Sequence, residues 1–362
     1  MAVILPPGSA PELSPSRSRG PAWGPLHMRL HQELLQRPTL LPRGARLLLA
    51  VSGGQDSMAL TRLLLDLRRL HIWELQLWHG NHGWRPEAAA QAEHLSTWAA
   101  QQGLAIQVER ADPPPSGEAA GRTWRYSRLQ HWASQLGCHH VVTGHTASDR
   151  AETVLLNLAR GAHLRGLSSL RRLRALGPGH TLVRPLLGLS RAETAAFCAE
   201  WDLPVWMDSS NDQLRYGRNR IRHQVVPVLE ELHPGASRRI SALAERLEQD
   251  PLEELLGLAL ALLIDPAAPR RLSREALGTC SAACHALLVR HWLERETGRR
   301  LAAKPVEALS RRLRDSPQPG SLDLGGGWRL TWDKQALLLE PDDHLPPGPL
   351  IPAPDGGDPN DA

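Results

Sequence analysis

Short apolar runs alternate with longer stretches of helical periodicity over roughly the first two thirds of the chain. The apolar runs predict strands at residues 45–51, 74–79, 105–109, 140–143 and 181–184. The stretches between them predict helices at residues 56–70, 86–102, 118–136 and 148–160. Such alternation is typical of a parallel sheet with helices on both faces, whose ligands bind where the strands end. We therefore expect a Rossmann-like α/β fold with its site at the carboxyl ends of the strands.

The pattern changes near residue 234, where helices replace the alternation. Helices are predicted at residues 237–263, 273–297 and 304–314, and "SLDLGGGWRLTWDKQALLLE" then predicts two or three short strands. We therefore expect one domain at 27–233, which opens with a helix at 27–36, and a smaller, mainly helical domain with a short β unit at 234–341. The ends, 1–26 and 342–362, are rich in Pro and Gly without periodicity, which predicts flexible tails.

Composition indicates a globular protein and excludes several classes. Hydrophobic residues make up 41% of the 362 residues, and no apolar run approaches the ~20 residues of a membrane helix. The N-terminus lacks the basic and apolar regions of an export signal. Cys138, Cys198, Cys280 and Cys284 have no disulfide-framework or CxxC spacing, so we expect a cytoplasmic protein without a membrane partner. The sequence is compatible with a homodimer and does not fix the oligomeric state.

The stretch "SGGQDS", from Ser52 to Ser57, links the first predicted strand to a helix. Gly53 and Gly54 let the backbone curl and present N–H groups, and the helix start adds its positive dipole end, so the loop predicts a phosphate site. The Asp56 carboxylate would repel a phosphate unless a cation lies between them, which predicts Mg²⁺ bound by Asp56. The alternative is an ordinary helix cap made by Asp and Ser side chains.

The arrangement S-G-G-x-D-S resembles the PP-loop of the ATP-pyrophosphatase superfamily. The resemblance implies that residues 52–57, with Gln55 among them, hold the β- and γ-phosphates of ATP, which is cut between its α- and β-phosphates. It therefore implies adenylation of a substrate with release of pyrophosphate.

Five further stretches narrow the family. They are "HGNHGWR" from His79, "GEAAGRTWRY" from Gly117, "TGHTASDRAETVLLNLARG" from Thr143, "LVRPLL" from Leu182 and "DSSNDQLRYGRNRIRHQVVPVL" from Asp208. Over about residues 43–232 they are together similar to the tRNA(Ile)-lysidine synthase family. The resemblance implies that ATP and Mg²⁺ serve to join L-lysine to C2 of the wobble cytidine of tRNA(Ile) with a CAU anticodon, through an adenylated tRNA. It also implies that the second domain binds tRNA.

Asp149 and Glu152 lie three residues apart at a predicted helix start, so both face one side. They can hold the ammonium groups of lysine, and one can accept a proton as the amine attacks. The alternative is that two acids at this position stabilise the helix dipole.

Arg122 and Arg125 are also three residues apart, and the resemblance implies that an Arg of this segment assists activation of the cytidine. The sequence does not decide between them, and we favour Arg125. His145, at a strand end, can contact the nucleotide ATP or the base; a buried, satisfied histidine is the alternative. The region of His79, Asn81, His82 and Arg85 lies where the second strand would meet the adenosine of ATP or the flipped cytidine, and we assign His79 to ATP. The Tyr126 ring either packs against the fold as part of its helix or stacks on a base of the RNA.

Arginines dominate two acid-poor parts of the sequence. The formal net charge is only +4. Lys304 and Lys334 are the only lysines among 42 Lys and Arg residues. Taken alone, this preference for arginine over lysine indicates the base composition of the genome, not RNA binding. The local absence of acids between Glu152 and Glu193 nevertheless favours a track for tRNA phosphates over a solvated face. The predicted tRNA-binding residues are Arg85, Arg165, Arg184, Arg218, Arg220 and Arg222.

Two departures from the family's pattern leave other functions open. Ser148 and Arg150 stand where the family usually has an acid and a Gln in "DDQAET", which weakens a two-carboxylate metal site. A tRNA thiolase of the same superfamily is an alternative, although this chain lacks the CxxC pairs common there. A catalytically silent nucleotide- or RNA-binding module is another, against which Asp56, Asp149 and Glu152 argue.

Overall fold

The computed structural model describes residues 23–162, 164–206, 217–249, 251–264, 267–299, 301 and 303–341. It divides into two compact units, the first reaching Glu248 and the second beginning at Gln249. Of the predicted tails, residues 1–22 and 342–362 lie outside the described residues, while Pro25 and Leu26 already belong to the first helix.

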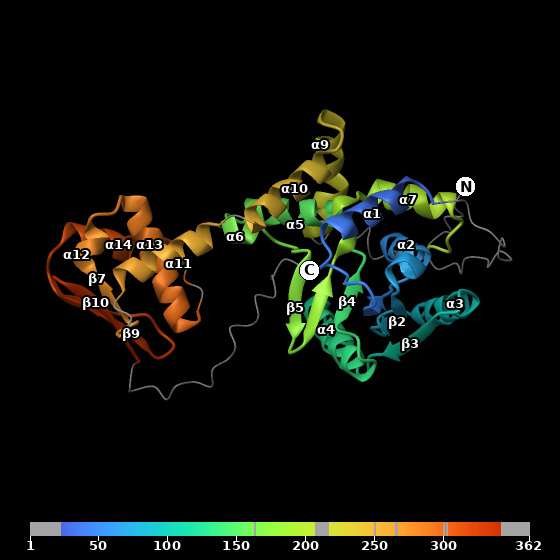
Figure 1. Ribbon diagram of the computed structural model, residues 1–362, viewed down its shortest axis with the longest axis horizontal. Coiled ribbons are helices and arrows are strands. Elements are labelled where there is room, and N and C mark those ends of the chain that lie inside the picture. The colour runs from blue at the N-terminus through green and yellow to red at the C-terminus, as the bar shows by residue number, and fades with distance from the viewer. Residues whose placement is uncertain are drawn as a thin grey trace. The chain divides into compact units, whose positions relative to one another are not determined.

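The first unit is built on a six-stranded sheet (Figure 1). Its strands are β1 (Arg46–Ala50), β2 (Glu74–Asn81), β3 (Ala105–Arg110), β4 (His140–Thr143), β5 (Leu173–Gly177) and β6 (His180–Val183), in the order β3-β2-β1-β4-β6-β5. All neighbours pair in parallel except β5, which is antiparallel to β6. The predicted α/β fold is confirmed, whereas β5 was not predicted.

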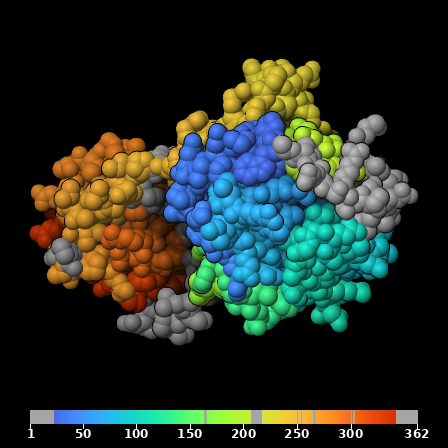
Figure 2. Space-filling model, turned by 45° about the vertical axis from the view of Figure 1, so that its right-hand side comes forward, coloured from blue at the N-terminus to red at the C-terminus, as the bar shows by residue number. Residues whose placement is uncertain are grey.

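Helices cover both faces of this sheet, because its strands carry apolar side chains on both faces. The helices are α1 (Pro25–Gln36), α2 (Gln55–His71), α3 (Ala88–Gln101), α4 (Glu118–Gln135), α5 (Ala147–Ala159), α6 (Leu164–Leu167) and α7 (Arg191–Glu200). Leu47 and Leu49 of β1 join the core beneath α1, α2, α3 and α7, while Leu48 joins a second core with Leu129 of α4. In Figure 2 the blue residues of α1 and α2 and the teal residues of α3 cover one face.

The chain then continues through short helical elements. A single 3₁₀ turn, η1 (Pro185–Gly188), precedes α7, and α8 (Gly217–Arg220), the π-helical η3 (Ile221–Val225), α9 (Val226–Leu232) and α10 (Ala236–Glu248) complete the first unit. α10 packs on α5. The single helix predicted at 237–263 is wrong, because the structure has two helices there. α10 ends at Glu248 and α11 (Leu252–Leu263) begins after Pro251. Proline has no N–H to donate and its ring clashes with the preceding turn, which explains the break.

The second unit joins helices to a four-stranded antiparallel sheet. Its further elements are β7 (Arg271–Ser273), α12 (Arg274–Gly278), α13 (Ala282–Thr297), α14 (Ala303–Asp315), β8 (Gly320–Asp323), β9 (Trp328–Trp332) and β10 (Ala336–Pro341), with the sheet order β7-β10-β9-β8. Its core includes Leu260, Trp292 and Leu330. The predicted helix at 273–297 is likewise interrupted, because Ser281 caps a new helix by accepting a hydrogen bond from the Cys284 amide. The assignment of separate catalytic and tRNA-binding domains stays a prediction.

Candidate active site

Residues 52–57 form the loop between β1 and α2, next to the point where the strand order reverses between β1 and β4. Gly53 has φ of +80°, which glycine adopts without strain, and Gly54 is the N-cap residue of α2. No side chain caps α2, and the Ser57 hydroxyl instead donates to the Gly54 carbonyl at 2.9 Å. The ordinary-cap alternative is therefore wrong, and the helix start has the form that suits an anion.

Two contacts from behind fix the peptide groups of this loop. The buried Gln91 side chain of α3 donates to the Ser52 carbonyl at 2.7 Å, and the Trp206 N–H donates to the Gly53 carbonyl at 2.9 Å. Because a trans peptide points its N–H away from its carbonyl, the N–H groups of Gly53 and Gly54 turn to the opposite side. The Gly54 N–H there makes a long, 3.4 Å bond to Ser52 Oγ. The loop is thus held with its donors on one side.

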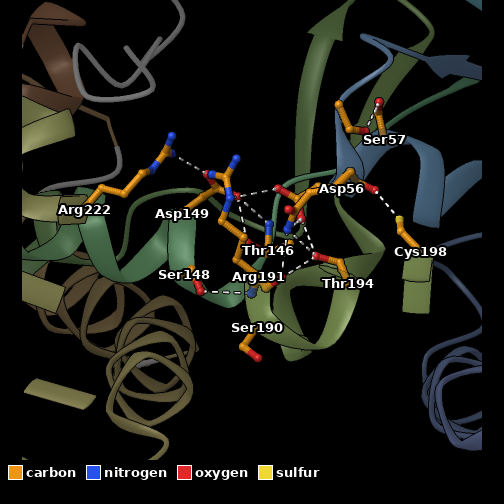
Figure 3. Close-up of polar contacts among 12 residues, drawn as sticks. Asp56, Ser57, Thr146, Ser148, Asp149, Ser190, Arg191, Thr194, Cys198 and Arg222 are labelled. Atoms are coloured by element: carbon orange, nitrogen blue, oxygen red, sulfur yellow. Dashed lines mark hydrogen bonds and ion pairs between the residues drawn. The ribbon is translucent and has the colours of Figure 1, made fainter. Parts of the chain in front are cut away.

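Asp56 lies in the first turn of α2 and faces α7 (Figure 3). Thr194 donates a short hydrogen bond to its Oδ1, Gln55 donates to the same oxygen at 3.4 Å, and Arg191 Nε lies 4.0 Å from its Oδ2. Burial, and then the charge of Asp149, raise the pKa of Asp56 to about 6 against the opposing effect of Arg191. Two carboxylates therefore share a largely enclosed site.

The start of α5 comes close to the same turn because Gly144 follows β4. A Cβ at Gly144 would lie 2.8 Å from the Asp56 carbonyl oxygen, which leaves no room for a side chain. Thr146 then caps α5: its N–H and its hydroxyl both donate to Asp149 Oδ2 at 2.8 Å. One oxygen of Asp149 therefore serves the helix start, as the dipole alternative expected, and the other remains for a cation.

The remaining carboxylate oxygens of Asp149 and Glu152 are bound by two arginines. Arg218 donates to Asp149 Oδ1 at 3.1 Å and to Glu152 Oε2 at 3.0 Å. Arg222 donates to Glu152 at 2.7 and 2.8 Å and to Asp149 Oδ1 at 3.3 Å. Burial opposes ionisation of Asp149, but Arg218, His145 and Arg222 outweigh it and hold the pKa of this carboxyl well below its usual range. Both acids are buried, and both are paired with arginine.

The two residues that depart from the family's usual motif have structural partners. The Arg191 N–H donates to Ser148 Oγ at 3.1 Å, so Ser148 joins the starts of α5 and α7. Arg150 is fully buried and donates to the Leu170 carbonyl at 2.7 and 3.1 Å, with Glu248 of α10 3.6 Å away. Neither Ser148 nor Arg150 adds a carboxylate to the site. The candidate metal-binding acids are Asp56 and Asp149.

The predicted histidines lie at two strand ends. His79 of β2 is buried and its Nδ1–H donates to the Val51 carbonyl at 2.8 Å, while burial lowers its pKa, so the ring is neutral. His145 is half-buried after β4 and bonds the Thr143 hydroxyl at 2.9 Å. It is one of the groups that lower the pKa of Asp149.

Arg122, Arg125 and Tyr126 share one end of α4. The guanidinium carbons of Arg122 and Arg125 lie 5.2 and 5.3 Å from the centre of the Tyr126 ring. Arg174 of β5 approaches the same ring at 4.7 Å. Tyr126 therefore serves as a packing surface for three guanidinium groups, and the choice between Arg122 and Arg125 stays open.

The predicted tRNA-binding arginines fall into different places. Arg184 is fully buried and donates to the Arg171 carbonyl at 2.7 Å, so the prediction of a phosphate contact is wrong for it. Arg218 and Arg222 pair with Asp149 and Glu152, and their contact with tRNA stays a prediction. Arg220 is exposed and Arg85 is half-buried. The side chain of Arg165 lies outside the described residues.

Sequence reasoning missed Thr194 and Gln91 and did not assign Arg191 to the site. The helix that carries Thr194 and Arg191 had a local signal, because Ser190 and Glu193 form a capping box in which the Ser190 N–H donates to Glu193 at 2.7 Å. Gln91 had no such signal, since its role is a contact with a carbonyl 39 residues away.

This fold and loop define a PP-loop nucleotide-binding protein. A family model described as a PP-loop domain matches residues 27–229. A tRNA(Ile)-lysidine synthase of Parasynechococcus marenigrum (strain WH8102) is 50% identical over 327 residues, which are 88% of this chain and 96% of that protein. One from a strain of Prochlorococcus marinus is 42% identical with the same coverage. The chain belongs to the tRNA(Ile)-lysidine synthase family.

A solved structure agrees at the level of the fold. The U34-tRNA thiolase NcsA from Methanococcus maripaludis, with its [4Fe-4S] cluster, has a TM-score of 0.51 and 17% identity over 62% of this chain and 78% of its own. Among the helices that the structure describes, none has both the length and the apolar character that a membrane crossing requires.

Proposed function

We propose that this protein is a tRNA(Ile)-lysidine synthase, which uses ATP to join L-lysine to C2 of the wobble cytidine in a CAU anticodon and acts in the cytoplasm. The observation that carries the proposal is the meeting of two unlike sites at neighbouring strand ends: a loop of amide donors after β1 and a buried carboxylate pair after β4. The named relatives, which this chain matches along most of their length, support the same function.

In the proposed reaction the cytidine C2 oxygen attacks the α-phosphorus of ATP, and pyrophosphate leaves. The ε-amine of lysine then attacks C2, loses a proton, and AMP leaves with the oxygen. Backbone amides of the loop at residues 52–57 would bind the departing pyrophosphate. Arg125, or Arg122 beside it, would bind the cytidine oxygen or the α-phosphate.

The residues around Asp56 suit a magnesium ion. Burial, and after it the charge of Asp149, raise the pKa of Asp56, and a divalent cation would offset both effects. No group of three or more potential ligands occurs in the described residues. Mg²⁺ is commonly bound through one or two carboxylates together with substrate phosphates and water. Asp56, with Asp149 nearby, would hold the ion, whose charge would offset that of the ATP phosphates.

Asp149 and Glu152 would bind the ammonium groups of lysine. The structure pairs them with Arg218 and Arg222, so lysine must compete with these guanidinium groups for the same oxygens. A proton released by the attacking amine would pass to this carboxylate pair.

The test is incorporation of labelled lysine into tRNA(Ile) by the purified protein with ATP and Mg²⁺. We expect one AMP and one pyrophosphate for each lysine incorporated. For Asp56→Asn we expect a loss of at least ~100-fold in kcat, because an amide cannot replace a carboxylate at a metal ion. Formation of AMP without entry of lysine into the tRNA contradicts the function, whereas full activity of Asp56→Asn contradicts the role of Asp56 alone.

A further inference from the structure

Trp84 is an exposed aromatic residue that the proposed reaction leaves without a role. It follows β2 in the chain, near the strand end that bears His79, and its relative exposure is 47%. Large aromatic rings are usually buried, so a half-exposed indole raises the question of what holds it in place and what covers it.

Three contacts fix the Trp84 ring although much of it remains open. Its Nε1–H donates to the Pro115 carbonyl at 2.7 Å. Its ring stacks on His82, with centroids 4.6 Å apart and an angle of 17° between the planes. Its edge lies over Gly121 of α4, where a Cβ would be 2.5 Å from the nearest ring carbon. A ring held by a hydrogen bond, a stack and a glycine seat loses little freedom when it binds a partner.

The layer beneath Trp84 is itself ordered. His82 meets the Trp124 ring edge-on, with centroids 5.0 Å apart. Burial, and then the charges of Arg125, His79 and Arg85, lower the pKa of His82 to about 4, so its ring is neutral at physiological pH. Trp84 thus rests on a neutral, fixed aromatic layer.

Guanidinium groups lie beside this aromatic layer. Arg122 directly follows Gly121, and Arg125 lies one turn further along the same helix. Both, with Arg174, surround the Tyr126 ring at 4.7–5.3 Å. Aromatic faces next to a group of cations are the arrangement that binds single-stranded nucleic acid, in which bases stack and phosphates pair with arginine.

We propose that Trp84 is a preset stacking platform for an unpaired base of the tRNA anticodon loop, beside the base that reacts. The proposal rests on the proposed function, because that function supplies an RNA substrate. The three guanidinium groups around the neighbouring Tyr126 ring would pair with phosphates of the same RNA. The alternative occupant of the platform, the adenine of ATP, is an outcome that the test distinguishes.

Binding of a labelled anticodon stem-loop RNA, followed by fluorescence anisotropy, tests the platform without requiring catalysis. We expect Trp84→Ala to weaken RNA binding by about 5- to 150-fold, the range for loss of one stacked base, and Trp84→Phe to keep most of the affinity. The dissociation constant for ATP should be unchanged in both variants. Trp23, which has a relative exposure of 40%, provides the matched control, and Trp23→Ala should bind the RNA as the wild type does.

Gly121→Ala separates the position of the ring from the stability of the fold. Alanine favours a helix interior over glycine, so α4 should not be weakened, yet the new methyl group occupies the seat of Trp84. We expect weaker RNA binding with only a small change in Tm, because the gain in helix propensity offsets part of the contacts that the displaced ring loses. Unchanged RNA affinity of Trp84→Ala overturns the proposal, and so does a loss of ATP affinity without a loss of RNA affinity, which would assign the platform to adenine. Absence of lysine incorporation by the wild type would contradict the proposed function but leave this binding comparison decisive.

Discussion

The strand ends after β1 and β4 are built alike, yet their polar groups are organised in opposite ways. Each is a short loop that leads into a helix, and Gly144 brings the two together. After β1 the binding groups are backbone amides, held by Gln91 and Trp206 from behind. After β4 the binding groups are carboxylates, and guanidinium groups of the same chain already bind them.

The difference follows from the cost of burying charge. Backbone amides are neutral, so a site for an anion can be preformed without its ligand. Buried carboxylates without a counter-charge are far more costly, so a site for a cation must carry a substitute until its ligand arrives. Arg218 and Arg222 are that substitute in this structure.

The largest expected effect comes from breaking the carboxylate pair. Glu152→Gln leaves Arg218 and Arg222 with one buried acid between them, and we expect it to lower the free energy of unfolding by about 3–5 kcal/mol. Urea denaturation measures the loss. The double variant Glu152→Gln with Arg222→Gln restores the balance of charge and should recover part of that stability. If the double variant is less stable than Glu152→Gln, the two side chains do not compensate each other and the comparison fails.

A second test removes a competitor instead of an acid. Arg222→Gln should raise the affinity for lysine, by up to ~10-fold, because one charge-assisted set of hydrogen bonds no longer has to be exchanged. Calorimetry of lysine binding to the ATP-bound protein measures it. Arg220→Gln is the matched control, since Arg220 is exposed and bonds Gln224. Weaker lysine binding by Arg222→Gln would show that this arginine helps to form the site.

The support behind the amide loop can be tested with an isosteric change. Gln91→Glu places an acceptor against the Ser52 carbonyl, so we expect ATP to bind about 10-fold more weakly. A protonated Glu can donate again, so the deficit should shrink as the pH falls from 8 to 5. Asp56, whose pKa is about 6, titrates in the same range, so the quantity to compare is the affinity ratio to wild type at each pH. A ratio that does not change with pH assigns Gln91 to packing alone.

How much of this site the sequence could predict depended on how far apart in the chain the interacting groups lie. The strand-to-helix loop at Gly53 and the acids of α5 follow from local spacing, and the structure places them as expected. The hydrogen bond from Thr194 to Asp56 joins residues 138 positions apart, and no local pattern specifies it. The predicted phosphate contact of Arg184 was wrong for the same reason, because its burial against the Arg171 carbonyl depends on how β6 and the loop before β5 pack.

The smallest expected effect is a dependence of stability on pH, and it comes from His82 in the aromatic layer beneath Trp84. The pKa of His82 is about 4 in the folded protein, below the ordinary value of 6.5, because of burial and the nearby Arg125, His79 and Arg85. Between these values the unfolded chain binds a proton that the folded chain does not, so stability falls as the pH drops from about 6.5 to about 4. After allowance for solvent screening the loss is roughly 1 kcal/mol.

His82→Phe keeps an aromatic ring under Trp84 and removes the titrating group, so its free energy of unfolding should fall less over this interval. Urea denaturation of both proteins at pH 7 and pH 4.5 gives the comparison. An equal loss in both proteins would mean that His82 binds its proton in the folded state as readily as in the unfolded one. The ring beneath Trp84 would then carry a charge at mildly acid pH, and the aromatic layer would not be a neutral site like the amide loop.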